Sequence, residues 1–303
     1  MKYLPWMSVM LVVAGGVMGC SDDSGSNDTA GGAAGSGAAM ATKDIVDTAV
    51  AAGSFTKLAD ALGKAGLVDA LKGKGPFTVF APTDGAFDAF EAKNPGVLAK
   101  LSKAELADVL KYHVVAGTAA MSGDLKDEQA LVTLLGSPVL IDTTGGVKVA
   151  DAKVTAADVK ASNGVIHVID KIILPPQDDI VTTAIAAGTF TSLAGALTSA
   201  GLVETLQGPG PFTVFAPTDA AFAKLAAVPT GDALKKVLLY HVVSGAVGSG
   251  DLTPGMVPTL LDGKSVAVDL KSGVKINMSM VTAANIITKN GVIHVVDSVL
   301  IPE

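Results

Sequence analysis

Few side chains in this sequence could do acid–base or metal chemistry. The 303 residues include four histidines and one cysteine, and all the other basic residues are lysines. His113 and His167 fall in one half of the chain, and His241 and His294 fall in the other. Zinc sites combine three or four His, Cys or carboxylate ligands at short, regular spacings, and no such spacing is present. The Gly-x-Ser-x-Gly, phosphate-loop and His-Glu-x-x-His motifs are also absent. We therefore expect no enzymatic activity, no metal site and no cofactor.

Cys20 has the clearest chemical assignment. Residues 1–19 combine Lys2 with a short apolar run and small residues, which is the pattern of an export signal. The end of this leader, Val17-Met18-Gly19-Cys20, resembles the bacterial lipobox, and the resemblance implies a lipid on the thiol of Cys20 and attachment to a membrane. The alternative is an ordinary secretory leader followed by a chance cysteine. Because Ser21 rather than Asp follows the cysteine, the resemblance also implies the outer membrane or cell surface.

Composition separates a tether from the part that folds. Residues 20–41 are mostly Ser, Gly, Ala and Asp, so we expect them to hold the lipidated cysteine and a flexible tether. Hydrophobic residues make up 49% of the chain, which is enough for globular domains. A formal charge of −7 without arginine disfavours nucleic acid as a partner, because such binding depends on neutralising phosphates.

The rest of the chain contains one unit twice. Residues 44–90 align without gaps to residues 179–225, with 32 identities. Tyr112-His113-Val114-Val115 recurs at Tyr240, and Asn163-Gly164-Val165-Ile166-His167-Val168 recurs at Asn290. A period near 130 residues indicates tandem domains rather than turns of a solenoid. We place them at 42–175 and 176–303, joined at Pro175-Pro176, where two prolines favour a stiff joint.

The sequence of each unit predicts helices followed by strands. Asp44 and Gly53 bound a first helix, and Gly66 ends a second. Residues 77–80 are expected to form a strand, and a capping box at Ser102 opens a helix that runs to about Tyr112. Residues 139–142 and 147–150 have the pattern of a hairpin, and residues 165–174 that of a strand after the Asn-Gly turn. Helices packed on an antiparallel sheet predict an α+β domain.

Three ordered motifs resemble those of the fasciclin domain. They are Thr78 to Asp84, the Tyr-His pair at Tyr112, and Asn163 to Asp170, and each occurs again in the second unit. The resemblance covers nearly the whole chain after residue 41. It implies, for each unit, a β-wedge or sandwich of about seven strands with packed helices. It also implies a protein that is extracellular or membrane-anchored and associated with adhesion.

The resemblance supplies the candidate site residues. The Tyr-His pairs, Tyr112-His113 and Tyr240-His241, match a motif associated with integrin binding in animal matrix members, so they are candidate partner-binding residues. The alternative is that these side chains pack at the end of a helix. His167 and His294 are expected to be buried in strands, where a histidine needs a hydrogen-bond partner. We expect a structural motif, Thr83-Asp84 or Thr218-Asp219, to bring that partner close.

The sequence therefore predicts a cell-envelope lipoprotein that mediates adhesion or ligand binding through two fasciclin-like domains. Its partner would be an extracellular protein, a polymer or a glycan. Two alternatives stay open: a periplasmic scaffolding protein, and a polysaccharide or small-molecule binding protein. Only 4% of residues are aromatic, and the one tryptophan lies in the leader, which weakens the polysaccharide alternative.

Overall fold

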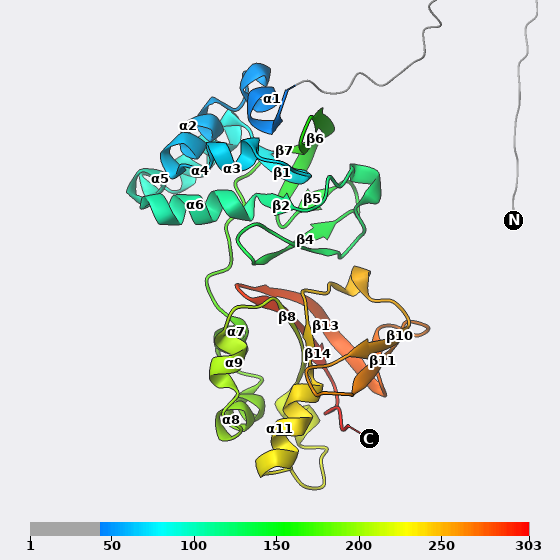
Figure 1. Ribbon diagram of the computed structural model, residues 1–303. Helices are drawn as coiled ribbons and strands as arrows, with labels where there is room; N and C mark the ends of the chain where they lie inside the picture. Colours follow the sequence, from blue (N-terminus) through cyan, green and yellow to red (C-terminus); the bar gives the residue numbers. More distant parts are fainter. Residues whose placement is uncertain (1–42, 303) are drawn as a thin grey trace, which may run out of the picture. The chain divides into compact units, whose positions relative to one another are not determined.

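The computed structural model describes residues 43–302, which form two domains of the same architecture (Figure 1). The described residues belong to one compact unit. The predicted leader, Cys20 and the tether lie outside the described residues. In each domain the helices come first along the chain, and most of the strands follow them.

The elements of the first domain are α1 (Ile45–Ala52), α2 (Thr56–Ala65), α3 (Val68–Lys72), β1 (Phe77–Pro82), α4 (Asp84–Lys93), α5 (Val97–Lys100), α6 (Lys103–Tyr112), β2 (Val114–Ala116), the 3-10 turn η1 (Ser122–Asp124), β3 (Ala130–Val132), β4 (Pro138–Asp142), β5 (Lys148–Val149), β6 (Ala152–Ala161) and β7 (Gly164–Ile169).

Those of the second domain are α7 (Ile180–Ala187), α8 (Thr191–Ser199), α9 (Val203–Gln207), β8 (Phe212–Pro217), α10 (Asp219–Phe222), α11 (Gly231–Tyr240), β9 (Val242–Ser244), the 3-10 turn η2 (Ser249–Asp251), β10 (Gly255–Pro258), β11 (Ser265–Asp269), β12 (Lys275–Ile276), β13 (Ser279–Thr288) and β14 (Gly291–Val296).

Each domain contains a seven-stranded sheet with the same strand order. The order is β2-β1-β7-β6-β5-β4-β3 in the first domain and β9-β8-β14-β13-β12-β11-β10 in the second. The predicted α+β class and the count of seven strands are confirmed. The expectation of a purely antiparallel sheet is wrong, because β1 runs parallel to β7 and β8 runs parallel to β14. Strands β1 and β7 are buried along most of their length, which is typical of strands with parallel neighbours rather than of half-exposed antiparallel strands.

Helix ends fall where the cap residues predict. Asp44 accepts a hydrogen bond from the Asp47 amide at 2.8 Å, and Gly53 ends α1 with φ of +70°. Ser102 and Glu105 form both bonds of a capping box at the start of α6. These side chains satisfy amide groups that the first turn of a helix leaves without partners. The predicted helix boundaries in the first domain are confirmed.

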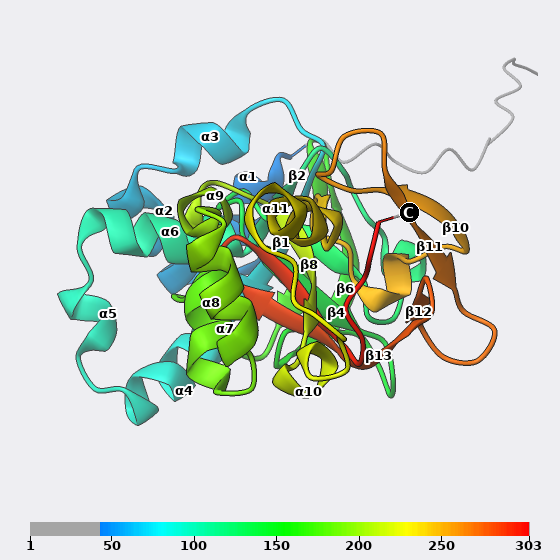
Figure 2. The same ribbon diagram turned by 90° about the horizontal axis from the view of Figure 1, so that it is seen from below.

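Each domain has two apolar clusters, one on the helical side and one on the strand side of the sheet. In the first domain, Ile45, Leu58 and Ile166 belong to the helical cluster, and Phe80 and Ile141 belong to the strand cluster. Figures 1 and 2 both place α2, α5 and α6 to one side of this domain and β4 and β6 to the other. Strands β1 and β7 lie between the two clusters and are therefore buried on both faces.

The sequence patterns do not predict strands β6 and β13, each of which is interrupted by bulges. Their register against β7 and β14 shifts twice. Asp158 in β6 and Asn285 in β13 lie at these shifts with φ of +62° and +60°. A bulge redirects a side chain out of the regular alternation, and here it turns Asp158 toward η1 and Asn285 toward η2.

Candidate functional site

The first Tyr-His pair is buried at the junction of the two apolar clusters. Tyr112 and His113 are each 3% exposed. The Tyr112 hydroxyl donates to the Pro138 carbonyl at 3.0 Å. His113 Nδ1 lies 2.8 Å from the Val109 carbonyl, and Nε2 accepts the Ile173 amide at 3.1 Å. Burial lowers the pKa of His113 to about 4, so the ring is neutral at pH 7.

The second Tyr-His pair repeats this arrangement. His241 Nδ1 lies 2.7 Å from the Val237 carbonyl, and Nε2 accepts the Leu300 amide at 2.9 Å. The Tyr240 hydroxyl donates to the Ser265 carbonyl at 2.9 Å. A partner at the surface cannot touch these side chains in this conformation. Of the two alternatives from the sequence, the geometry favours packing.

His167 and His294 have partners other than the predicted ones. His167 Nε2 lies 2.9 Å from the Ala120 carbonyl, and the ring stacks on Phe80 with centroids 5.7 Å apart. His294 does the same with Val247 and Phe215. The prediction that Thr83-Asp84 would supply the partner is wrong, because the loop before η1 supplies the Ala120 carbonyl instead. Strand alternation predicts the burial of these histidines but not the path of that loop.

Asp84 and Asp219 instead cap helices from outside. Helix α2 begins without a capping side chain of its own. Asp84 accepts hydrogen bonds from the amides of Thr56 and Lys57, at 3.2 and 2.8 Å, and one from the Thr56 hydroxyl. Burial raises the pKa of Asp84, but these bonds outweigh it and hold the pKa below its ordinary value. Asp219 does the same for α8, and the Ser192 amide is the main cause of its pKa of about 2.

We expect Asp84→Ala to destabilise the first domain by about 1 kcal/mol, the typical cost of losing a helix cap. Asp88→Ala is the matched control, because the Asp88 carboxylate only pairs with the exposed Lys57. Urea unfolding at pH 7 measures both variants. Equal midpoints for the two would contradict the role of Asp84 as a cap. The contribution of Thr83 to stability should be independent of that of Asp84, because the Thr83 hydroxyl caps α4 by accepting the Ala86 amide.

Asn163 and Asn290 matter more than the sequence indicated. The Asn-Gly pairs predict only tight turns. Asn163 Nδ2 donates to the carbonyls of Leu71 and Gly73, at 2.8 and 3.0 Å, and its Oδ1 accepts the Ile45 amide at 3.0 Å. Asn290 makes the same three bonds in the second domain. One side chain thus joins the start of α1 and the end of α3 to the turn before β7. The recurrence of Asn163 as Asn290 was the available signal.

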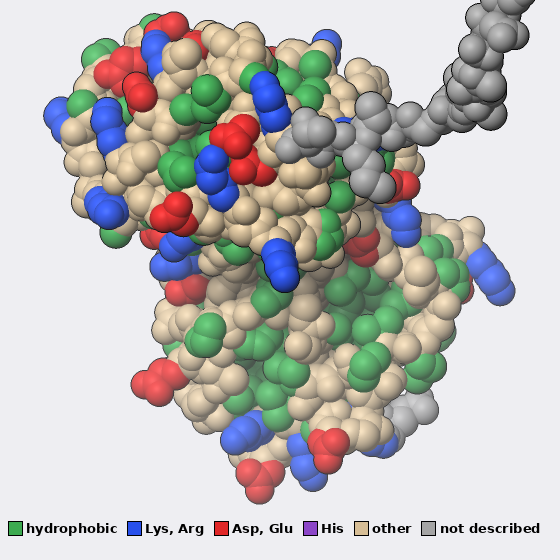
Figure 3. All heavy atoms as spheres, turned by 45° about the horizontal axis from the view of Figure 1, so that its top comes forward, with side chains coloured by type: hydrophobic (Ala, Val, Ile, Leu, Met, Phe, Trp, Pro, Cys, Tyr) green, Lys and Arg blue, Asp and Glu red, His purple; other side chains and the backbone are tan. Residues whose placement is uncertain are grey.

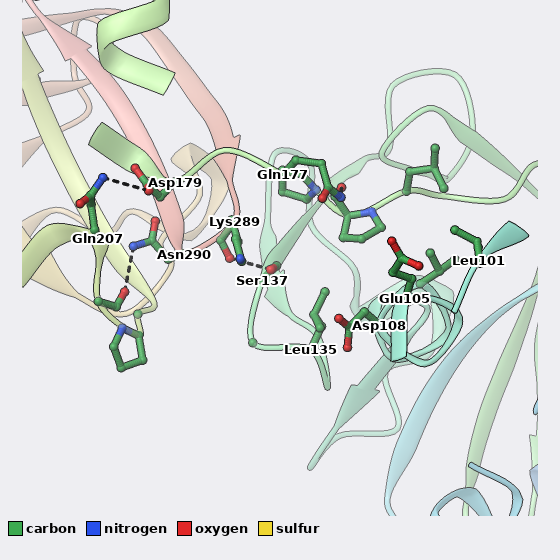
Figure 4. A pocket seen from close by; sticks show the side chains of 18 of the residues that line it. Leu101, Glu105, Asp108, Leu135, Ser137, Gln177, Asp179, Gln207, Lys289 and Asn290 are labelled. Atoms are coloured by element: carbon green, nitrogen blue, oxygen red, sulfur yellow. Dashed lines mark hydrogen bonds between the residues drawn. The ribbon is translucent and has the colours of Figure 1, made fainter. Parts of the chain in front are cut away.

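A cleft of about 750 Å³ lies at the joint between the domains (Figure 4). Leu101 and Leu135 line it from the first domain, together with the carboxylates of Glu105 and Asp108. The second domain contributes polar groups, including Lys289. The volume of this cleft is within the range of small-molecule sites, which often lie between domains. Within residues 43–302, no cluster of three or more His, Cys, Asp and Glu could hold a metal ion.

The surface is of mixed charge. On the face drawn in Figure 3, lysines and acidic residues lie among one another, and no continuous basic field is seen. Among the described residues, no helix is both long and apolar enough to span a bilayer.

The comparison with protein families finds the same unit twice in the chain. The family model described as Fasciclin domain matches residues 53–175 and again residues 188–302. Transforming growth factor-beta-induced protein ig-h3 of Sus scrofa is 30% identical over 77% of this chain, which spans 36% of that protein. Human periostin is 30% identical over 78% of this chain, which spans 30% of periostin. The chain therefore spans about a third of these two relatives.

Two further matches are of similar size to one or both domains. Uncharacterized protein sll1735 of Synechocystis is 44% identical over 43% of this chain and 97% of its own length, which is one domain. A solved FAS1 domain pair from the insect cell adhesion molecule fasciclin I is similar over 82% of this chain and 97% of that structure, with a TM-score of 0.37 and 18% identity.

Proposed function

Because the chain belongs to the fasciclin domain family, we propose that it is a cell-envelope lipoprotein that mediates adhesion or ligand binding through its two domains. Fasciclin domains are found in adhesion and ligand-binding proteins. The observation that carries the proposal is the pair of such domains behind the leader that ends in Val17-Met18-Gly19-Cys20. The lipid on Cys20 would hold the pair at the membrane, and the partner would be an extracellular protein, a polymer or a glycan.

Exposed methionines on the second domain offer a place for such contact. Met278 in the turn between β12 and β13 is 95% exposed, and Met280 beside it is 41% exposed. The corresponding residues of the first domain are Asp151, which pairs with Lys171, and Lys153. The second domain therefore presents apolar, flexible side chains where the first presents charges. Methionine adapts to irregular apolar surfaces, and it is common at binding faces.

The test measures the retention of cells that express the chain. The cells are placed on surfaces coated with matrix proteins, polysaccharides or synthetic polymers. We expect cells with the native chain to be retained on at least one coating, and cells with Cys20→Ser to lose that retention. Met278→Asp with Met280→Lys should weaken retention, whereas Met278→Leu with Met280→Leu should preserve it. If cells that lack the chain are retained equally on every coating, the adhesion proposal is wrong. A periplasmic scaffold would instead survive protease added to intact cells.

Small-molecule or polysaccharide binding is a second candidate, and the cleft of Figure 4 favours it. Apolar walls with a few carboxylates and amides could hold a ligand that combines an apolar body with hydroxyl or amino groups. Such a ligand would raise the melting temperature of the chain in proportion to the logarithm of its concentration.

A further inference from the structure

The η2 turn of the second domain contacts a short segment of the first. We call Gly248–Asp251 the receptor turn and Asp127–Ala130 the docking segment. The Gly250 amide donates to the Glu128 carbonyl at 3.1 Å, and the Ala130 amide donates to Asp251 Oδ2 at 2.9 Å. The Ser249 hydroxyl donates to the Glu128 carboxylate. Away from this contact, Ser137 Oγ donates to the Lys289 carbonyl at 2.6 Å, as Figure 4 shows.

Two glycines allow the receptor turn to come this close. A Cβ atom at Gly248 would lie 2.2 Å from the Glu128 carbonyl oxygen, and one at Gly250 would lie 1.7 Å from that of Asp127. The corresponding turn of the first domain, η1, has Met121 in place of Gly248 and retains Gly123 in place of Gly250. A Cβ atom at Gly123 would have no atom within 4 Å. The backbone approach is therefore specific to the second domain.

A single Asp-to-Asn difference sets the direction of the serine hydroxyl. In the first domain, the amide and hydroxyl of Ser122 both donate to the carboxylate of Asp158, each at 2.6 Å. The corresponding residue of the second domain is Asn285. Asn285 Oδ1 accepts the Ser249 amide at 2.8 Å, and its Nδ2 donates to the Ser249 hydroxyl at 2.7 Å. The opposite amide orientation would set two donors against each other.

Asn285 therefore leaves the hydroxyl proton of Ser249 free for the carboxylate of Glu128. An aspartate at position 285 would take up that proton, as Asp158 does in the first domain. It would also place a second carboxylate near that of Glu128, and like charges repel. Gly248 and Gly250 thus allow the close approach of the two backbones, and Asn285 determines that the Ser249 hydroxyl donates to Glu128.

We propose that the receptor turn is a recognition site for the docking segment and fixes the two domains as one body in one order. The second domain cannot extend the same contact to the first domain of another copy of the chain. The turn in the first domain is blocked by Met121 and Asp158. The corresponding loop of the second domain, Thr253–Gly255, is one residue shorter than Lys126–Gln129 of the first and has no carboxylate. Head-to-tail contacts that do repeat produce open filaments, and these differences prevent that outcome. The recognition site does not depend on the proposed adhesion.

The test measures the distance between spin labels, one in each domain, by pulsed electron paramagnetic resonance. Labels are attached at Lys64→Cys and Lys235→Cys, both exposed helix positions, in the full chain with Cys20→Ser. We expect one narrow distance distribution for this chain. Asn285→Asp and Gly250→Ala should each abolish the narrow peak and leave a broad distribution.

The repeat supplies matched controls. Asp158→Asn and Gly123→Ala are the corresponding changes in the first domain, outside the contact, and both should leave the peak narrow. Glu128→Gly removes the carboxylate at a position where φ is +56°, so the backbone accepts it without strain. It should broaden the distribution without lowering the melting temperature of either domain. Narrow peaks for Asn285→Asp, Gly250→Ala and Glu128→Gly would overturn the proposal, and so would equal broadening by the two controls.

Discussion

Lowering the pH from 7 to 4 should reduce the unfolding free energy of each domain by roughly 3 kcal/mol, because each contains one fully buried, neutral histidine of a Tyr-His pair. Burial lowers the pKa of His113 and of His241 from the ordinary 6.5 to about 4. Between these two values the unfolded chain binds a proton that the folded chain does not. Stability is therefore complete above pH 6.5, falls as the pH falls through this window, and loses nothing more from these residues below about 4.

The hydrogen bonds explain why protonation is resisted. Nε2 of His113 accepts the Ile173 amide, so a proton on Nε2 would set two donors against each other. His241 faces the Leu300 amide in the same way. The depressed pKa values of Asp142 and Asp219, both about 2, affect stability mainly below about pH 4, where these carboxyls begin to bind protons in the unfolded chain. The histidine contribution is therefore separable from that of the carboxylates.

Urea unfolding at pH 7, 6, 5 and 4 measures the effect. The double variant His113→Gln and His241→Gln is the control, since a glutamine amide can donate to one carbonyl and accept from one amide without titrating. Its unfolding free energy should be lower at pH 7 and should fall much less than that of the native chain down to pH 4. A smaller decrease should remain in the second domain, because burial also lowers the pKa of His294. A native chain that is equally stable at pH 7 and pH 4 would contradict the neutral, buried state of these rings.

Gly164→Ala should destabilise the first domain by about 3 kcal/mol or more, at the upper end of the cost of overpacking a core. A Cβ atom at this position would lie 2.1 Å from the Phe77 carbonyl oxygen and 2.8 Å from Cδ1 of Ile45. Gly164 is the first residue of β7 and lies opposite Phe77 in the parallel pair that β7 forms with β1. The obstacle is backbone, which cannot move without breaking the register of that pair.

Gly63→Ala is the matched control for this prediction. Gly63 lies inside α2, and a Cβ atom added there would have no atom within 4 Å. Alanine is preferred to glycine in a helix by roughly 0.5–1 kcal/mol, so this variant should be slightly more stable than the native chain. Thermal unfolding of both variants gives the comparison. A Gly164→Ala chain that melts within a degree or two of the native chain would contradict the close packing of β1 on β7.

Local sequence patterns predicted where the helices end. The roles that depend on contacts between residues distant in the sequence could not be predicted from such patterns. Asp44, Gly53 and Ser102 act within one helical turn, so their roles could be predicted from neighbouring residues alone. The carboxylate of Asp84 acts on α2, 28 residues earlier, and no periodicity contains that pairing. Asn163 joins segments more than 90 residues apart. Its role depends on the tertiary fold, and only its recurrence as Asn290 pointed to it.

The candidate sites, too, could be predicted only in part from the sequence. The recurrence of Tyr112-His113 identified a shared feature of the two copies, but a recurring pattern does not distinguish a buried pair from an exposed one. The receptor turn was missed because its information lies in the differences between the copies, Met121 against Gly248 and Asp158 against Asn285. Identities between the copies indicated the fold, and differences between them indicate where the second domain does something the first does not.

The edges of the two sheets would suit a protein held at high local density on a membrane. The outermost strands are short: β2, β3 and β9 have three residues each, and β10 has four and ends at Pro258. Short edges and proline offer little backbone for a neighbouring chain to extend a sheet. In a chain with a mean hydropathy of +0.49, these short edges therefore reduce the backbone through which crowded copies could start intermolecular β-structure.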